Sequence, residues 1–181
     1  TERDVVEIHD RENRLCELLE GTLLEKTMGS FESYLALYSG HLLTTFVREH
    51  QLGIVLGADG MMRLAPGLVR IPDVSFIRWE RFPERKLPRD RVFRVAPDLA
   101  VEILSEGNTE DEMGIKVSEY FRAGARLVWL IDPEARSARV YTSADHCEVL
   151  AENGILDGRD VLPGFQVRLR DLIDAVPRQA K

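Results

Sequence analysis

Two carboxylates, each near the middle of an apolar run of the kind found in buried strands, are the residues best suited to carry chemistry. Asp73 lies within residues 69–77 and Glu102 within residues 98–104. An ionised carboxylate in a buried strand is unfavourable unless a partner compensates its charge. Since neighbouring strands lie ~4.8 Å apart, both side chains could reach one ion. Two carboxylates, a backbone carbonyl and water suit Mg²⁺ or Mn²⁺, which prefer oxygen ligands.

A lysine that follows Glu102 in the sequence could complete this site. Lys116 falls on a helix expected from about residue 109 to 124, ~85° from the centre of its apolar stripe. From that flank its ammonium could position an attacking water or stabilise charge that grows on a phosphate. The alternative is an exposed ion pair with Glu112, four residues earlier. For the two carboxylates, the alternative is that arginine or backbone donors satisfy them.

Asp98 is a rival for the place of Asp73, because Pro97-Asp98 repeats the dipeptide Pro72-Asp73. It shares a strand face with Glu102, but four residues along a strand span ~13 Å, too far for one common ion. We therefore expect Asp98 to mark the start of its strand.

A stretch rich in cations and aromatics, residues 78–94, separates the two carboxylate runs. It could attract phosphate and bind DNA, with Arg85, Lys86 and Arg89 as the contacts. The alternative is a solvated loop held by an aromatic anchor. Because the net charge of the chain is −7, any DNA-binding surface must be local.

The remaining composition excludes several other classes of protein. No apolar run approaches the ~18 residues of a membrane span, and no secretory signal is seen. Two distant cysteines give no disulfide framework and fit a reducing cytoplasm. The four histidines are scattered, which disfavours a zinc site, and neither a phosphate-binding glycine loop nor a Gly-x-Ser-x-Gly motif occurs.

The order of the expected elements predicts a mixed α/β domain with one sheet flanked by helices. Residues 1–15 are expected to be a loose segment, 16–175 one domain and 176–181 a tail. The first half of the domain is expected to form a hairpin around Gly21, a helix over 31–50 ended by Gly53, and a hairpin over 54–64 that turns at Asp59-Gly60. Strands around Asp73 and Glu102 follow, and then the 109–124 helix. Strands at 127–131 and 137–142 are expected to pair, and the tail is expected to form short strands with a closing helical turn.

Nearly the whole chain, from about residue 18 to 172, resembles the Uma-type restriction endonuclease family, a bacterial group in the PD-(D/E)xK nuclease superfamily. The matching segments are 17–23, 70–76, 96–105, 116–124, 128–133 and 162–165. The resemblance implies a restriction-endonuclease-like core of helix, three strands, helix and strand, with a mixed central sheet and extra N- and C-terminal strands. It also implies metal-dependent hydrolysis of phosphodiester bonds.

The resemblance also assigns roles to residues by their position in the family's motif. Asp73 would be the motif aspartate and Glu102 the motif acid. Leu104 stands where the motif lysine is expected, two residues after the acid, and in this family the lysine has moved to the following helix, where Lys116 stands. Glu32, in the first helix, matches a place where related nucleases often carry a polar or acidic residue in a supporting role.

The sequence therefore predicts a cytoplasmic endonuclease that hydrolyses DNA with Mg²⁺ or Mn²⁺, with Asp73 and Glu102 as metal ligands and Lys116 stabilising the transition state. The alternatives are a non-catalytic DNA-binding or assembly module and a metal hydrolase of small phosphoesters. A homodimer is expected, because cutting both strands of a duplex needs two symmetry-related sites or one site that acts twice. The hairpin around Gly21 and the strands after Ser137 offer edges for a second subunit.

Overall fold

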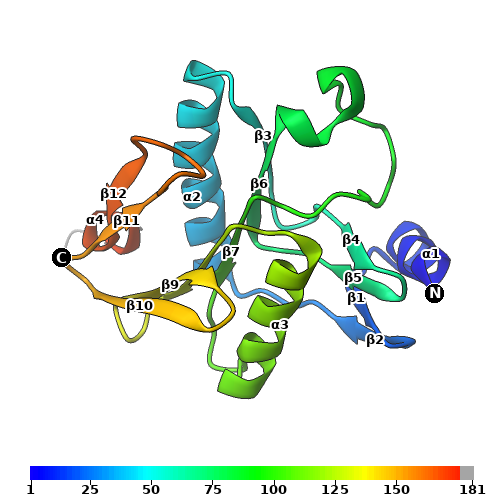
Figure 1. Ribbon diagram of the computed structural model, residues 1–181. Helices are drawn as coiled ribbons and strands as arrows, with labels where there is room; N and C mark the ends of the chain where they lie inside the picture. The colour runs from blue at the N-terminus through cyan, green and yellow to red at the C-terminus, as the bar shows by residue number, and fades with distance from the viewer. Residues whose placement is uncertain (176–181) are drawn as a thin grey trace.

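A six-stranded mixed sheet forms the centre of the computed structural model, which describes residues 1–175 (Figure 1). Its strands lie in the order β10-β9-β8-β7-β6-β3, and only β7 and β8 are parallel. The bounds are β3 Gly53–Leu56, β6 Val74–Arg78, β7 Leu99–Ile103, β8 Leu127–Asp132, β9 Ser137–Ser143 and β10 His146–Ala151.

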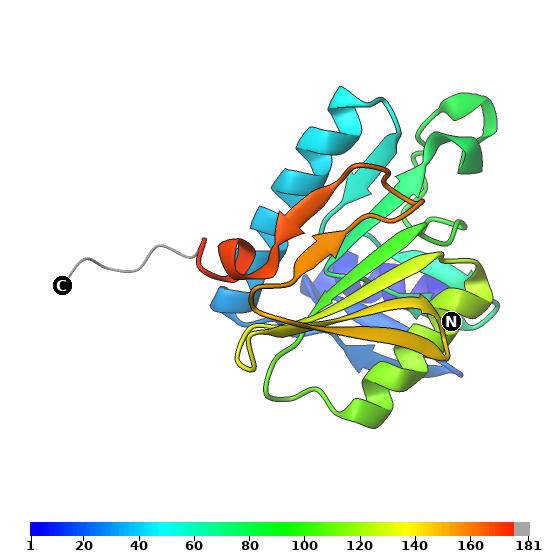
Figure 2. The ribbon, with the colours of Figure 1, turned by 60° about the vertical axis from the view of Figure 1, so that its left-hand side comes forward.

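The two long helices cover opposite faces of this sheet (Figure 2). Helix α2, Ser30–Glu49, packs with Val101 of β7 and Trp129 of β8 in one core cluster. Helix α3, Glu110–Ala123, packs with Ala100 and Val128, the residues next along the same strands, in a second cluster. Because β7 and β8 are covered on both sides, their sequences are apolar apart from Glu102 and the terminal Asp132, instead of alternating.

A second sheet lies beside the first, with strand order β2-β1-β5-β4. Its strands are β1 Cys16–Leu19, β2 Thr22–Glu25, β4 Met62–Ala65 and β5 Leu68–Arg70. The expected hairpin around Gly21 is the β1–β2 pair, and Gly21 has a φ of 87°, which glycine adopts without steric cost. This small sheet brings the end of the hairpin close to the start of β6.

The remaining elements are short. Two 3₁₀ turns, η1 Trp79–Arg81 and η2 Pro83–Arg85, follow β6. The tail forms β11 Ile155–Asp157, β12 Gln166–Arg168 and α4 Leu169–Ile173, whose apolar side chains join the α2 cluster. The expected tail over 176–181 lies outside the described residues. In the described part, no helix is long and apolar enough to cross a membrane.

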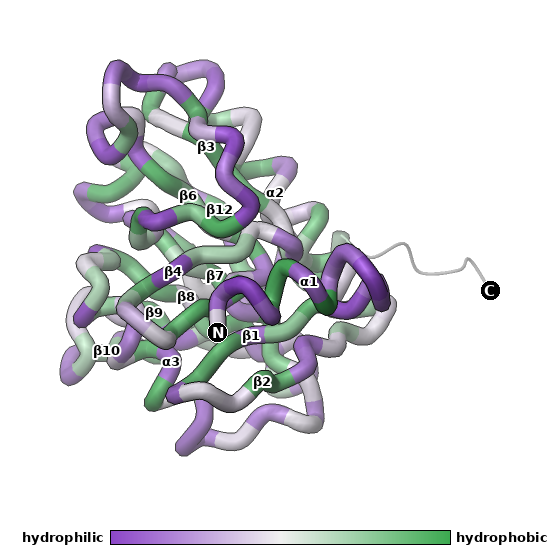
Figure 3. Tube along the Cα trace, turned by 90° about the vertical axis from the view of Figure 1, so that its right-hand side faces the viewer, coloured by the Kyte–Doolittle hydropathy of each residue, from purple (hydrophilic) through white to green (hydrophobic). Residues whose placement is uncertain are grey.

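Residues 1–15 differ from the expected loose segment, because they contain helix α1, Glu2–Glu12. Most of its side chains are hydrophilic, as Figure 3 shows, and this composition hid the helix. Val5 is its one fully buried residue and packs with Leu18 and Val69 of the small sheet. That contact helps to hold the helix on the domain, since burying one aliphatic side chain contributes about 1.5–3 kcal/mol.

The expected hairpin over 54–64 is also wrong. Its two strands belong to different sheets, because β3 pairs with β6 whereas β4 pairs with β5. Asp59-Gly60 therefore turns the chain from one sheet to the other. Gly53 does not end the preceding helix, whose last residue is Glu49, but begins β3. A Cβ there would lie 2.0 Å from the carbonyl oxygen of Ile77, so only glycine fits the close strand pairing.

The core order predicted from the sequence is confirmed. Helix α2 is followed by strands β3, β6 and β7 of the central sheet, then by α3 and β8. The strand at 137–143 pairs antiparallel with β8, as expected. Helix α3 is capped by Thr109, whose hydroxyl oxygen accepts from the backbone N–H of Glu112, and ends at Gly124 in a left-handed conformation.

Candidate active site

Strand pairing brings the two predicted carboxylates together. Val74 of β6 lies opposite Val101 of β7, so Asp73, which directly precedes β6, falls beside Glu102, the next residue of β7. Both residues are buried, each with a relative exposure of 4%. The backbone N–H of Ile103 donates to Asp73 Oδ2 at 2.7 Å, which fixes the aspartate against the neighbouring strand.

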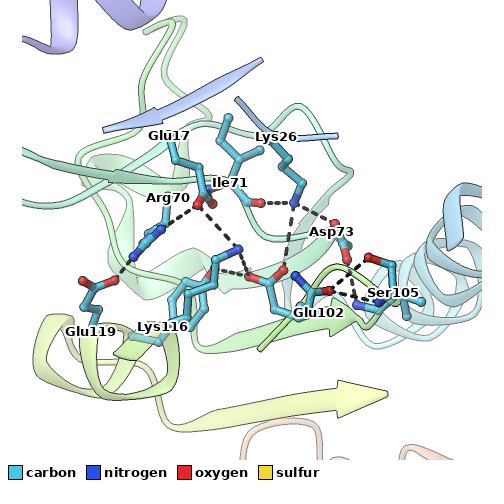
Figure 4. Close-up of polar contacts among 12 residues, drawn as sticks. Glu17, Lys26, Arg70, Ile71, Asp73, Glu102, Ser105, Lys116 and Glu119 are labelled. Atoms are coloured by element: carbon cyan, nitrogen blue, oxygen red, sulfur yellow. Dashed lines mark hydrogen bonds and ion pairs between the residues drawn. The ribbon is translucent and has the colours of Figure 1, made fainter. Parts of the chain in front are cut away.

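Lys116 reaches this pair from the flank of α3, as the sequence predicted (Figure 4). Its Nζ lies 3.7 Å from Glu102 Oε1 and 3.5 Å from Glu17 Oε2. The lysine side chain is only 8% exposed. The alternative of an exposed ion pair with Glu112 is therefore wrong, because α3 turns Lys116 towards the sheet.

A second lysine enters the site from the small sheet and was missed by sequence reasoning. Lys26 directly follows β2, and its Nζ lies 2.6 Å from Asp73 Oδ1 and 4.0 Å from Glu102 Oε2. The same ammonium donates to the carbonyl oxygen of Ile71 (Figure 4). Nothing local marks Lys26, since it follows a strand whose side chains are mostly exposed.

A buried arginine with two carboxylates supports Lys116 from behind, and sequence reasoning missed this group too. Arg70 Nη1 donates to Glu17 Oε2 at 2.6 Å and Arg70 Nε to Glu119 Oε2 at 2.7 Å. The backbone N–H of Ile71 donates to Glu17 Oε1 at 3.0 Å. The available signal was Arg70 within the same apolar run as Asp73, because a buried arginine requires carboxylate partners.

The whole cluster holds four carboxylates, Glu17, Asp73, Glu102 and Glu119, against three cations, Lys26, Arg70 and Lys116. It therefore carries one formal negative charge in excess. Burial raises the pKa of Glu102, and the lysines beside it only partly oppose this effect. Burial alone would lower the pKa of Lys116, but the carboxylates of Glu102 and Glu17 outweigh it and the net pKa is raised. An added cation would relieve this excess of negative charge.

Glu102 has a further partner on α3. The hydroxyl of Tyr120 donates to Glu102 Oε1 at 2.5 Å, and Tyr120 is fully buried. Burial, followed by the charge of Glu102, raises the pKa of Tyr120 well above its ordinary value, so the phenol keeps its proton as a donor. Glu102 Oε1 thus faces Tyr120 and Lys116, whereas Oε2 faces Lys26.

A pocket of about 250 Å³ is lined by five residues of the cluster, Glu17, Lys26, Asp73, Glu102 and Lys116. Residues 24–28, the start of α2, the loop after β7 and the first turns of α3 form its walls. Glu32, the supporting residue predicted from the resemblance, is one of the lining residues. The loop after β7 contributes the polar side chains of Ser105 and Asn108, which hydrogen-bond to each other.

Asp98 lies at the start of β7, as expected, and belongs to a separate contact. Its Oδ2 accepts from the backbone N–H of Arg78 at 2.9 Å, and Arg81 binds both of its carboxylate oxygens at 3.0 Å. Asp98 thereby ties the start of β7 to the end of β6. Arginine and backbone donors satisfy this carboxylate, which was the alternative considered for Asp73 and Glu102.

The structure does not bring the predicted DNA contacts into the pocket. Arg85 belongs to η2, beyond the far end of β6 from Asp73, and Lys86 and Arg89 follow in the same loop (Figure 1). Strand β6 has five residues and spans ~17 Å. Arg85 and Lys86 lie near Glu80 and Glu84, at 3.8 and 2.6 Å, and all four side chains are exposed.

The donor set around Lys26 fits a divalent cation. Among residues 1–175 no group of three or more His, Cys, Asp and Glu side chains has the geometry of a metal site. However, Asp73 Oδ1, Glu102 Oε2 and the carbonyl oxygen of Ile71 all face the Lys26 ammonium. Two carboxylate oxygens and a carbonyl oxygen are the hard donors that Mg²⁺ and Mn²⁺ take, usually with several waters. The Lys26 ammonium lies among these three oxygens.

The fold resembles that of a known crystal structure. That structure, described as a putative nuclease belonging to DUF820 from Anabaena variabilis ATCC 29413, matches with a TM-score of 0.78 and 20% sequence identity, over 88% of this chain and 90% of that chain. The family model Uma2, described as "Putative restriction endonuclease", matches residues 4–171. The chain belongs to the Uma2 family. No curated protein matches it significantly.

Proposed function

We propose that the protein is a Mg²⁺- or Mn²⁺-dependent endonuclease that hydrolyses phosphodiester bonds of DNA in the cytoplasm. The observation that carries the proposal is the convergence of Asp73, Glu102 and Lys116 on one buried, polar pocket, although they come from three separate elements. Membership of the Uma2 family supports DNA as the substrate.

Each residue of the cluster has a distinct task in this proposal. Asp73 and Glu102 would hold the divalent ion, which when bound polarises the scissile phosphate and lowers the pKa of the attacking water. Lys116, held by Glu17 beside Glu102, stabilises the negative charge that develops on the phosphate. Arg70 positions Glu17, and the hydroxyl of Tyr120 orients Glu102.

Substitution of Lys116 separates catalysis from metal binding. We expect Lys116→Met to lower DNA cleavage roughly a hundredfold, because a charge-stabilising donor contributes about that much. Mn²⁺ affinity should not fall, since the lysine is not a ligand. The assay follows nicking of supercoiled plasmid with Mg²⁺, with EDTA as the blank, alongside calorimetry with Mn²⁺. Wild-type turnover in the variant would limit Lys116 to a structural ion pair.

The modest size of the pocket favours, as a second candidate, a metal hydrolase of small phosphoesters. A volume of about 250 Å³ suits a single phosphate and its neighbouring groups better than a duplex. The two functions are distinguished by parallel assays with plasmid DNA and a chromogenic phosphodiester. Turnover of the small ester alone would support the second candidate.

The loop that carries Arg85, Lys86 and Arg89 is proposed to bind DNA away from the reacting phosphate. Reversing all three to glutamate should weaken DNA binding and flatten its salt dependence, by about 0.9 in the logarithmic slope for each phosphate that the loop no longer neutralises. Cleavage at saturating DNA should be unchanged, because none of the three lines the pocket. The matched control reverses three exposed arginines outside this loop, Arg3, Arg11 and Arg122. An unchanged salt slope in the loop variant would place DNA elsewhere.

A homodimer is proposed for cleavage of both strands. Strands β2 and β10, from the two regions expected to offer edges, are edge strands of their sheets. Val149 on β10 is 70% exposed, and a partner could cover it. Light scattering at micromolar concentration should give twice the chain mass of 20.6 kDa. A mass near 20.6 kDa would show that the protein is a monomer.

A further inference from the structure

Lys26 occupies the position that a divalent ion would need. Its ammonium lies 2.6 Å from Asp73 Oδ1 and 4.0 Å from Glu102 Oε2. It also donates to the carbonyl oxygen of Ile71. A Mg²⁺ ion bound through the same oxygens would lie ~2.1 Å from Asp73 Oδ1. The Lys26 ammonium and a divalent ion cannot both lie here, because two positive charges so close together repel each other strongly in a buried site. Lys26 and the ion are therefore mutually exclusive.

The position of Lys26 at the edge of the small sheet allows its side chain to move out of the pocket. The residue lies just beyond β2, an edge strand of the small sheet, and residues 24–28 around it form one wall of the pocket. No strand of the central sheet has to shift if the side chain rotates outward. Leu24 and Glu25, which precede it, are exposed, so solvent close to Lys26 can hydrate the displaced ammonium.

Lys116 does not have to move when an ion binds, although it is about as buried as Lys26. It contacts Glu102 through Oε1, the oxygen that also accepts from Tyr120, and its second partner is Glu17. An ion between Asp73 Oδ1 and Glu102 Oε2 leaves those contacts in place. The two lysines thus have separate positions, one behind Glu102 and one between the two carboxylates.

We propose that Lys26 is a tethered cation that fills the metal position between Asp73 and Glu102, and that a divalent ion binds only after this side chain swings out. The proposal rests on the proposed metal site. In the metal-free protein the lysine compensates the two buried carboxylates and keeps the site shaped for a cation. It also lowers the apparent metal affinity, because only the fraction of molecules with Lys26 displaced can bind the ion.

Calorimetry with Mn²⁺ on the wild type, Lys26→Met and Lys26→Arg tests the competition. Removing the ammonium should tighten Mn²⁺ binding about tenfold or more, whereas the arginine variant, which keeps a tethered charge, should stay weak. Equal or weaker binding in Lys26→Met than in the wild type would overturn the proposal and leave the metal site standing. If neither protein binds Mn²⁺, both the inference and the proposed metal site are wrong.

A second measurement uses the wild-type protein and avoids any effect of the substitution on folding. A small amine-acylating reagent, read by mass spectrometry, should modify Lys26 slowly without metal, because the side chain is 9% exposed and paired. Adding Mn²⁺ should accelerate modification of Lys26 several-fold. Lys116, at 8% exposure, and Lys86, at 77%, serve as buried and exposed controls whose rates stay unchanged. Unchanged or slower modification of Lys26 would contradict its displacement.

Discussion

Glu102→Gln is expected to reduce DNA cleavage roughly a hundredfold or more and to leave the folded protein about as stable as the wild type. The loss follows because the carboxylate would be a direct metal ligand, and even residues that only support ligands contribute about 10–100-fold. Glutamine keeps the shape of the side chain and an oxygen that can accept from Tyr120.

The stability should hold because the charge of Glu102 is unfavourable where it lies. Burial raises the pKa of this carboxyl, which means that keeping it ionised is less favourable in the folded protein than in the unfolded chain. Removing the charge also leaves three carboxylates facing three cations in the cluster. Plasmid cleavage and urea unfolding measure the two effects. Retained cleavage would exclude Glu102 as a ligand, and a large loss of stability would show that its role is structural.

Arg70→Met is expected to have the largest effect on folding, a loss of about 3–5 kcal/mol in the free energy of unfolding. Arg70 is 2% exposed, and it is the shared partner of Glu17 and Glu119. Methionine fills much of the same volume but leaves two buried carboxylates without that partner. Their desolvation is then poorly compensated, which is the source of the loss. Urea unfolding measures it.

Two further variants make the Arg70 prediction specific. Lys86→Met breaks an ion pair whose side chains are 77% and 75% exposed, and should change stability by no more than about 0.5 kcal/mol. Adding Glu119→Gln to Arg70→Met should recover part of the loss, since one of the two uncompensated charges is then removed. A loss in Arg70→Met no larger than in Lys86→Met would contradict the buried network.

The elements that carry Glu102 and Lys116 could be predicted because each is marked by a local pattern. The run around Asp73 was expected to be one strand, but it contains β5 and β6 of two different sheets, and Asp73 lies between them. An apolar run identifies a covered strand, and a carboxylate within it is conspicuous because burial is costly there. The helical period from Thr109 to Gly124 put Lys116 on a flank that could reach the sheet. Such signals depend only on neighbours in sequence, so they survive without knowledge of the tertiary structure.

The second half of the site depends on contacts between distant segments. Lys26 meets Asp73 only because the small sheet pairs β1 with β5, and Arg70 meets Glu119 only because α3 packs beside that sheet. The turn at Asp59-Gly60 predicts a reversal of the chain but not which strands pair on either side of it. Helix α1 escaped prediction for a related reason, since Val5 is its one buried residue and its ion pairs join Glu2 to Arg63 and Asp10 to Arg91, which are distant in sequence.

Titration of Mn²⁺ into wild-type protein and Asp73→Asn tests the central claim most directly, because it needs no knowledge of the DNA that is cleaved. Asparagine keeps the size of the side chain and an oxygen for the backbone N–H of Ile103, but lacks the charge that a divalent ion requires. The account predicts saturable binding in the wild type and at least tenfold weaker binding in the variant. Absence of binding in the wild type, or equal binding in both proteins, would contradict it.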